Sequence, residues 1–371
     1  MAESIAADTG RDARPARLEA LRNAVEKAHL DGVLLTGLAN IRYLTGFSGT
    51  SALLFVSQRD AIFLTDFRYE TQAAQEVGAI AQVQIEAQSL WARLWALLPT
   101  LTGLDVLGFE STHIEHRDFQ RLLEAGSRWQ GRPTVDLVET LRERKDAGEL
   151  ALIQRAADVA CDALAATLPQ LHEGMSELAV AGVLERCLRE AGSEGFPFPT
   201  IVASGERSAL PHARSSRREL RRGDFLLLDF GAEVDGYCSD ITRTFVIGRA
   251  SAEQRDFYEI VREANRLAAS AVHAGMKGRD ADALARDYIE GCGHGPLFGH
   301  SLGHGIGLEV HEAPRLARTA EGVLSLDSVV TIEPGIYRPG WGGVRVEDDV
   351  HLSTRGPQLL TRFPRELTEL A

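Results

Sequence analysis

The first part of the chain alternates short apolar runs with segments in which apolar residues recur at helical spacing. Such spacing predicts a helix over residues 15–29. Short apolar runs bounded by Gly, Ser or Asp predict strands at residues 32–37, 51–57, 61–66 and 106–110. Helical segments are expected among them at residues 68–77, 89–98 and 114–126. This alternation of strands and helices predicts a small α/β domain over residues 1–140.

The pattern changes after a charged segment, LRERKDAGEL (141–150), which we expect to open a long helix that runs to about residue 170. A second helix is expected at residues 176–191, and further helices at 252–274 and 280–292. Apolar runs with turn residues between them predict strands at 225–231, 239–248, 329–337 and 344–352. Helices beside mostly antiparallel hairpins predict an α+β domain over residues 141–371.

Composition agrees with a globular protein of two domains. The chain has 371 residues, of which 44 % are hydrophobic and 25 % charged. It has 40 Lys and Arg residues against 53 Asp and Glu residues, which gives a net charge of −13. This acidic balance argues against a nucleic acid or an anionic membrane surface as a partner.

The cysteines and the N-terminal segment indicate the cellular compartment in which the protein is expected. The four cysteines, Cys161, Cys187, Cys238 and Cys292, are far apart and form no CxxC pair, which is typical of reduced thiols. Residues 1–17 are polar and contain no apolar run of the kind found in a signal peptide. No segment approaches the ~20 apolar residues that span a bilayer. We therefore expect a cytoplasmic protein.

Two acidic residues accompany the first predicted hairpin of the second domain. Asp229 ends the apolar run FLLLDFG, and Asp240 begins the return strand after a turn at Asp235-Gly236. An antiparallel hairpin brings two such carboxylates together on one face. A carboxylate that follows three leucines is costly to bury unless it is paired or bound to a cation, so we expect a functional role for this pair.

A second hairpin repeats the arrangement. Glu333 ends the run VVTIE, and Glu347 follows the glycine-rich turn PGWGG (339–343). Four convergent carboxylates cannot all remain ionised within a few ångströms unless cations lie between them. Oxygen ligands in this number, together with a histidine, suit a pair of divalent metal ions such as manganese or cobalt.

Histidines supply the remaining candidate chemistry. His300, His304 and His311 lie within one glycine-rich segment, FGHSLGHGIGLEVHE (298–312). A single histidine is more often an ordinary core or surface residue, but three so close together before the carboxylate hairpin favour a functional site. His212 lies in a loop before the first acidic strand, and a surface residue is the simpler interpretation when it is considered alone.

The segments DFG, SDITRTF, GHGIGLEVHE, TIEPGIY and GGVRVEDD together resemble the pita-bread metallopeptidases, the superfamily of methionine aminopeptidase, aminopeptidase P and prolidase. NIRYLTGFSG (40–49) and LTDFRYETQA (64–73) resemble the creatinase/prolidase N-terminal domain, which methionine aminopeptidases lack. The resemblance therefore favours the prolidase and aminopeptidase P branch. It implies a C-terminal pita-bread domain, α+β in class, preceded by a smaller α/β creatinase-like domain.

The resemblance also assigns a dinuclear metal centre. It implies two divalent ions, manganese with cobalt or zinc as alternatives, held by Asp229, Asp240, His304, Glu333 and Glu347. Asp240 and Glu347 would bridge the two ions, Asp229 would hold one, and His304 with Glu333 would hold the other.

The same resemblance implies a catalytic set of His212, His311, Glu333 and Arg345. Glu333 would move a proton to the leaving nitrogen, and the two histidines would hydrogen-bond the tetrahedral intermediate. Arg345, two residues before Glu347 and so on the same strand face, would orient a ligating carboxylate. His300 would line the proline-side pocket. Arg315 and Arg318 are the two candidates for binding the substrate carboxylate.

These residues predict an Xaa-Pro dipeptidase, similar to prolidase, that acts on proline-containing peptides through a metal-bridging hydroxide. An aminopeptidase P that trims longer Xaa-Pro peptides is the nearest alternative. A catalytically silent pita-bread protein that binds peptides, or a metal-free hydrolase similar to creatinase, belongs to another class. These classes typically lose metal ligands, whereas this sequence retains all of them. The resemblance further implies a homodimer.

Overall fold

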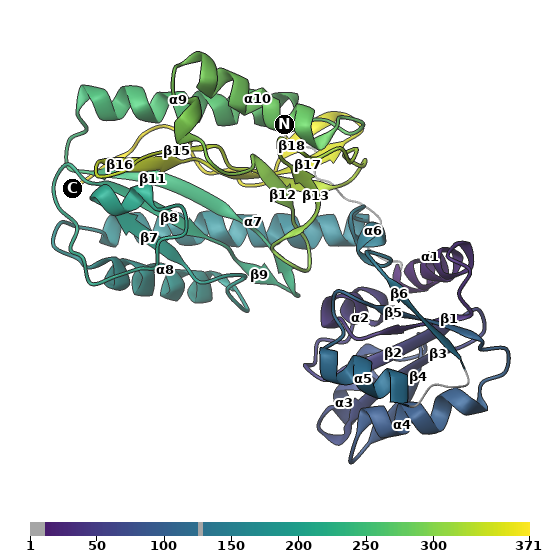
Figure 1. Ribbon diagram of the computed structural model, residues 1–371. Coiled ribbons are helices and arrows are strands. Elements are labelled where there is room, and N and C mark those ends of the chain that lie inside the picture. Colours follow the sequence, from purple (N-terminus) through teal and green to yellow (C-terminus); the bar gives the residue numbers. More distant parts are fainter. Residues whose placement is uncertain (1–11, 125–128) are drawn as a thin grey trace. The chain divides into compact units, whose positions relative to one another are not determined.

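The computed structural model describes residues 12–124 and 129–371. The chain divides into two compact units, Met1–Arg142 and Glu143–Ala371 (Figure 1). None of the helices within the described ranges combines the length and the apolar character that crossing a bilayer requires.

The N-terminal unit is built on one mixed sheet of six strands in the order β4-β3-β2-β1-β5-β6. Its strands are β1 (Gly32–Leu35), β2 (Ala52–Ser57), β3 (Ala61–Asp66), β4 (Gln82–Glu86), β5 (Val106–Glu110) and β6 (Gln130–Thr134). Its helices are α1 (Arg14–Lys27), α2 (Leu38–Thr45), α3 (Glu70–Glu76), α4 (Leu90–Leu97), α5 (His116–Glu124) and α6 (Glu139–Arg142). The pairs β1–β2 and β2–β3 are antiparallel, whereas β1–β5, β3–β4 and β5–β6 are parallel.

The predicted α/β pattern of this unit is confirmed, although three elements were not predicted. Strands β4 and β6 form the two edges of the sheet, and their sequences, QVQIE and QGRPT, are too polar to indicate a strand. Helix α2 is short, and its first turn depends on a distant residue: the carboxylate of Glu110 accepts hydrogen bonds from the backbone N–H groups of Thr36 and Gly37. Local sequence carries no sign of such a contact.

The C-terminal unit contains a four-stranded sheet, a five-stranded sheet and two short hairpins. The four-stranded sheet has the order β19-β11-β8-β7, with β7 (Ile201–Ser204), β8 (Phe225–Phe230), β11 (Ile241–Ile247) and β19 (Glu369–Leu370). The five-stranded sheet has the order β13-β12-β14-β17-β18, with β12 (Gly303–Gly305), β13 (Glu312–Leu316), β14 (Val329–Ile332), β17 (Asp348–Ser353) and β18 (Gly356–Leu359). The hairpins pair β9 (Glu233–Val234) with β10 (Tyr237–Cys238) and β15 (Gly335–Arg338) with β16 (Gly342–Arg345).

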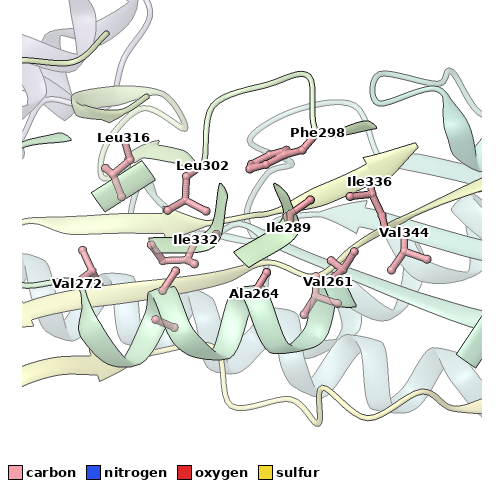
Figure 2. Close-up of a cluster of buried hydrophobic side chains, with 14 of the residues drawn as sticks. Val261, Ala264, Val272, Ile289, Phe298, Leu302, Leu316, Ile332, Ile336 and Val344 are labelled. Carbon is pink, nitrogen blue, oxygen red and sulfur yellow. The ribbon is translucent and has the colours of Figure 1, made fainter. Parts of the chain in front are cut away.

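Two pairs of helices cover these sheets. Helices α9 (Ala252–Ala271) and α10 (Gly278–Gly291) lie on one side, and α7 (Ala147–Thr167) and α8 (Glu177–Ala191) on the other (Figure 1). Figure 2 shows Val261 and Ala264 of α9 directed toward the strand residues Ile332, Ile336 and Val344, within one buried apolar cluster. A second cluster joins α7 and α8 to β7, β8 and β11. The expected α+β class of this unit is confirmed.

The expected single helix from residue 141 to about 170 is wrong, because the chain forms α6 and α7 with residues 143–146 between them. Asp146 ends the interruption as the N-cap of α7. Its side chain accepts a hydrogen bond from the N–H of Glu149, and the Glu149 side chain accepts one from the N–H of Asp146. This reciprocal pair is a capping box, which defines the start of a helix.

The two long strands expected at 329–337 and 344–352 are each broken into two. Residues 333–334 separate β14 from β15, and residues 346–347 separate β16 from β17. Because β14 pairs with β17 and β15 with β16, both breaks fall at the same level of one long hairpin. They place Glu333 and Glu347 where the chain passes from one sheet to the other.

Helix α8 offers a matched test of the packing between helices and sheet. Leu184 is fully buried in the cluster with β8 and β11, whereas Leu178 on the same helix is 49 % exposed. We expect Leu184→Ala to lower the free energy of unfolding by about 2–5 kcal/mol, because it leaves a cavity. Leu178→Ala should change it by less than about 0.5 kcal/mol. Urea denaturation followed by circular dichroism measures both, and equal losses would contradict the packing described.

Candidate active site

The first acidic pair comes from the hairpin formed by β8 and β11. Asp229 lies near the end of β8, opposite Thr242, and Asp240 directly precedes β11. The intervening chain turns at Asp235 and Gly236, which both have positive φ values, 46° and 73°, as a tight hairpin turn requires. The side chains of Asp229 and Asp240 are buried, so neither carboxylate is solvated in the way that a surface acid would be.

The second acidic pair lies at the strand breaks. The Glu333 N–H donates to the carbonyl of Leu302 at 2.8 Å, and the Glu347 N–H donates to the carbonyl of Thr242 at 3.1 Å. The Thr242 hydroxyl donates to Glu347 Oε2 at 2.6 Å. Thr242 therefore joins the two hairpins, and sequence analysis missed it. Its position two residues after Asp240, on the same strand face, is the signal that would have indicated it.

His304 on β12 faces these carboxylates with its Nε2 atom. Its Nδ1 atom lies 3.0 Å from the carbonyl oxygen of Gly305, which can only accept, so Nδ1 carries the proton. The unprotonated Nε2 lies 3.5 Å from Glu333 Oε1 and 3.9 Å from Asp240 Oδ2. A histidine whose other nitrogen donates to a backbone carbonyl is the usual arrangement of a metal ligand.

The donor set fits a divalent cation. Asp240, His304 and Glu347 each offer a ligand atom, and the three atoms lie within 4.8 Å of one another. Asp240 Oδ1 is buried and has no hydrogen-bond partner among the described residues. A buried carboxylate oxygen without a partner is costly, and a metal ion would satisfy it.

The electrostatics of the acidic cluster also favour a bound cation. Burial, and then the charge of Glu347, raises the pKa of Asp240 well above its usual range. Burial, and then the charges of neighbouring carboxylates, also raises the pKa of Glu333, and it raises that of Glu347 to about 8. Burial lowers the pKa of His304 to about 4, which keeps the imidazole neutral and able to ligate. A bound cation would reverse the shifts of the carboxyl groups.

A chain of hydrogen bonds runs from Asp229 to His300. Arg345 donates to Asp229 Oδ2 at 2.5 Å and to the Tyr337 hydroxyl at 2.8 Å. The Tyr337 hydroxyl lies 3.0 Å from His300 Nε2. Because His300 Nδ1 faces the carbonyl of Ser301 at 2.8 Å, Nε2 is the acceptor and Tyr337 the donor. Sequence analysis did not identify Tyr337, although burial raises its pKa to about 12 and so preserves the donating hydroxyl.

The loop that carries His300 is held by an ion pair on α10. Arg286 pairs with Asp282 and also donates to the carbonyls of Phe298 and His300 at 3.0 and 2.7 Å. Asp282 in turn accepts from the N–H of Leu302 at 3.0 Å. Asp and Arg four residues apart on a helix were visible in the sequence, but that spacing occurs on many exposed helix faces.

His311 and His212 lie beside the ligand cluster. The rings of His304 and His311 are 4.4 Å apart between centroids. Burial, and then the charge of His212, lowers the pKa of His311. His212 also acts on the pKa of Asp229, after the larger effects of burial and Arg345. Both histidines are exposed, so they are accessible to a molecule that enters the site.

The two candidate arginines differ in position. Arg315 lies on β13 directly opposite His304 on β12, and its side chain is exposed. Residues directly opposite in an antiparallel pair project to the same face of the sheet. Arg318 lies beyond the end of β13 and forms an ion pair with Glu290 at 2.9 Å, with 60 % of its side chain exposed. The structure therefore brings Arg315, and not Arg318, to the side of the ligand cluster.

A second group of possible ligands, Glu110, His113 and Glu139, lies in the N-terminal unit. Asn40 donates to Glu110 and to Glu139, both at 2.6 Å, and His113 Nε2 lies 2.7 Å from Glu139. Backbone N–H groups at the start of α2 donate to the other Glu110 oxygen. Because these oxygens already accept hydrogen bonds, we interpret the group as a polar network that holds α2.

The raised carboxyl pKa values predict how pH affects the metal-free protein. An unfolded Glu titrates near about 4.3, whereas Glu347 in the folded chain has a pKa of about 8. Between these values the folded chain binds a proton that the unfolded chain has lost, so the free energy of unfolding falls as pH rises. We expect urea midpoints of the metal-free protein to fall from about pH 5 to about pH 8. Glu347→Gln should make the decline shallower, and an unchanged slope would contradict this assignment.

Comparisons with known proteins match both units of the chain. The model of metallopeptidase family M24 matches residues 151–354, and that of the creatinase/prolidase N-terminal domain matches residues 17–144. The Xaa-Pro dipeptidase of Pyrococcus furiosus is 35 % identical over 95 % of this chain and 99 % of its own.

Two solved structures extend the comparison. The Xaa-Pro dipeptidase from Bacillus anthracis superposes with a TM-score of 0.93 at 41 % identity, over 96 % of this chain and 100 % of its own. The X-Pro aminopeptidase from Thermotoga maritima superposes with a TM-score of 0.88 at 35 % identity, over 95 % of this chain and 99 % of its own. The expected pita-bread domain, preceded by a creatinase-like domain, is confirmed. The chain belongs to metallopeptidase family M24 and carries the creatinase/prolidase N-terminal domain.

Proposed function

We propose that the protein is an Xaa-Pro dipeptidase with a dinuclear metal centre. The observation that carries the proposal is the position of Arg315, which lies opposite the candidate ligand His304 with its guanidinium exposed. A dipeptide substrate has its C-terminal carboxylate close to the scissile bond, and an arginine binds a carboxylate with good geometry. The relatives in Pyrococcus furiosus and Bacillus anthracis, both named as Xaa-Pro dipeptidases, support the same assignment.

The proposed ligands are the four carboxylates and His304. We assign Asp240 and Glu347 as bridging ligands, Asp229 to one ion, and His304 with Glu333 to the other. The short distance between ligand atoms of Asp240, His304 and Glu347 supports this arrangement. Arg345 and Thr242 support it indirectly, because they hold Asp229 and Glu347 by hydrogen bonds.

When bound, two divalent ions acidify a water molecule and polarise the scissile carbonyl. The side chains of the protein perform the remaining tasks. Glu333 takes up a proton and delivers it to the leaving proline nitrogen. His311 and His212 donate hydrogen bonds to the oxygen that becomes negative in the transition state. His300, fixed by Tyr337 and Arg286, lines the side of the pocket that receives the proline ring.

The metal, the compartment and the assembly are further parts of the proposal. Manganese is the proposed metal, because a donor set of four carboxylates and one imidazole suits it. A cytoplasmic location is supported by the four cysteines, all of which are free thiols. We also propose a homodimer, because the resemblance of the N-terminal domain to its family implies one.

Substitutions of the neighbouring residues His304 and His311 should separate metal ligation from catalysis. We expect His304→Ala to lose one metal ion together with activity. His311→Ala should retain both ions and lower kcat by on the order of 10²–10³, because a donor to the developing oxyanion acts mainly in the transition state. Metal content by emission spectroscopy and steady-state kinetics measure these effects. Equal metal content in the two variants would show that the roles are assigned to the wrong histidines.

The arginines on and after β13 test the substrate class. With an Xaa-Pro dipeptide, Arg315→Met should raise KM by about 10-fold or more, the usual effect of losing a charge-assisted hydrogen bond. Arg318→Met is the matched control and should leave KM unchanged, since Arg318 pairs with Glu290 at the surface. A tripeptide that shares the same Xaa-Pro start should be a poorer substrate for the native enzyme.

The same assay distinguishes the alternatives. Preferential cleavage of the tripeptide, with no effect of Arg315→Met, would favour an aminopeptidase, as the relative in Thermotoga maritima is named. Peptide binding without cleavage in the metal-loaded protein would favour a silent binding module.

A further inference from the structure

Helix α9 buries an amide side chain among apolar residues that pack against the sheet. Its buried face packs Val261, Ala264 and Ala268 against the strands that flank Glu333 and Glu347, as Figure 2 shows for the first two. Asn265 lies on this face and is fully buried. Burying an amide among apolar side chains costs free energy unless the amide is hydrogen-bonded.

The Asn265 amide contacts two strands at once. Its Nδ2 atom donates to the carbonyl oxygen of Ile332 at 2.8 Å and to that of Val346 at 3.1 Å. An amide nitrogen has two hydrogens, so each carbonyl can receive one. These carbonyls belong to the residues immediately before Glu333 and Glu347.

The bridge lies where the strands separate. Ile332 pairs with Asp348 in the five-stranded sheet, whereas Gly335 pairs with Arg345 in the hairpin of β15 and β16. Between these levels, the N–H groups of Glu333 and Glu347 donate outward to the carbonyls of Leu302 and Thr242. The Asn265 amide thus spans the two chains at the break in their pairing.

We propose that Asn265 is a positioning residue of the metal centre, which fixes the spacing of the Glu333 and Glu347 backbones so that their carboxylates reach the same pair of ions. The inference rests on the proposed ligand set. A role limited to attaching α9 to the sheet would affect the stability of the metal-free protein, but not its affinity for metal once folded. Metal affinity therefore distinguishes the two roles.

The test uses metal-free full-length protein titrated with Co²⁺, followed by calorimetry and by the visible absorption of bound cobalt. Asn265→Leu keeps the size of the side chain and removes both donors, and Asn265→Asp replaces the donor with an acceptor. We expect each variant to bind cobalt about 10–100-fold more weakly than the native protein, with an altered absorption spectrum. Thermal unfolding without metal identifies a variant that has lost its fold, and the other variant then carries the comparison.

Tyr258→Phe is the matched control. Tyr258 lies on the same helix, is buried, and donates to the carbonyl of Arg365 at 2.8 Å, a residue that is not a candidate ligand. This variant should keep native cobalt affinity. If Asn265→Leu binds cobalt as tightly as the native protein, or if Tyr258→Phe loses as much cobalt affinity as Asn265→Leu, the proposed role of Asn265 would be overturned. Neither result would overturn the ligand assignment. A native protein that binds no cobalt would overturn the ligand assignment and the role of Asn265 with it.

Discussion

The repulsion among four acidic side chains around His304 is the constraint on which the C-terminal unit depends. Asp229, Asp240 and Glu347 are buried, so desolvation and mutual repulsion both oppose their ionised forms. Such a cluster is tolerated only with protons or cations between the carboxylates. Much of the surrounding structure holds these groups in place: Arg345 binds Asp229, and Thr242 binds Glu347. The stability and the chemistry of this unit are therefore linked through the same residues.

The backbone brings the two pairs of acidic residues together in two different ways. Asp229 and Asp240 are joined by a hairpin that turns tightly at Asp235-Gly236, so local geometry brings them together. Glu333 and Glu347 lie at the two breaks of a second hairpin, and these breaks free their backbone N–H groups to bond outside the ladder. In the second arrangement, the backbone pairing between the two chains is lost at the break. Hydrogen bonds from the side chains of Thr242 and Asn265 therefore stabilise this part of the hairpin.

Sequence analysis found residues whose role can be inferred from their immediate neighbours in the chain. An acid that ends an apolar strand, as Asp229 and Glu333 do, is visible in one chain segment. Tyr337, Asp282 and Asn265 could not be found in this way, because each acts on a group brought near only by folding, 37, 20 and 67 residues away. The N-terminal unit shows the same division: its strands with apolar cores were predicted, whereas the polar edge strands β4 and β6 were not.

The proposed roles in substrate choice and in metal binding fall on different strands of one sheet. The proposed ligand His304 lies on β12, an interior strand, whereas Arg315, the proposed contact of the substrate carboxylate, lies on β13, which is the edge of that sheet. An edge strand is paired on one side only, so a change in its sequence disturbs fewer contacts than a change in β14 or β17. The register of β12 with β13 sets which residue of the edge strand stands beside His304. On the proposed roles of Arg315 and His304, a new residue on β13 would alter which substrate the pocket recognises and would leave the metal ligands in place.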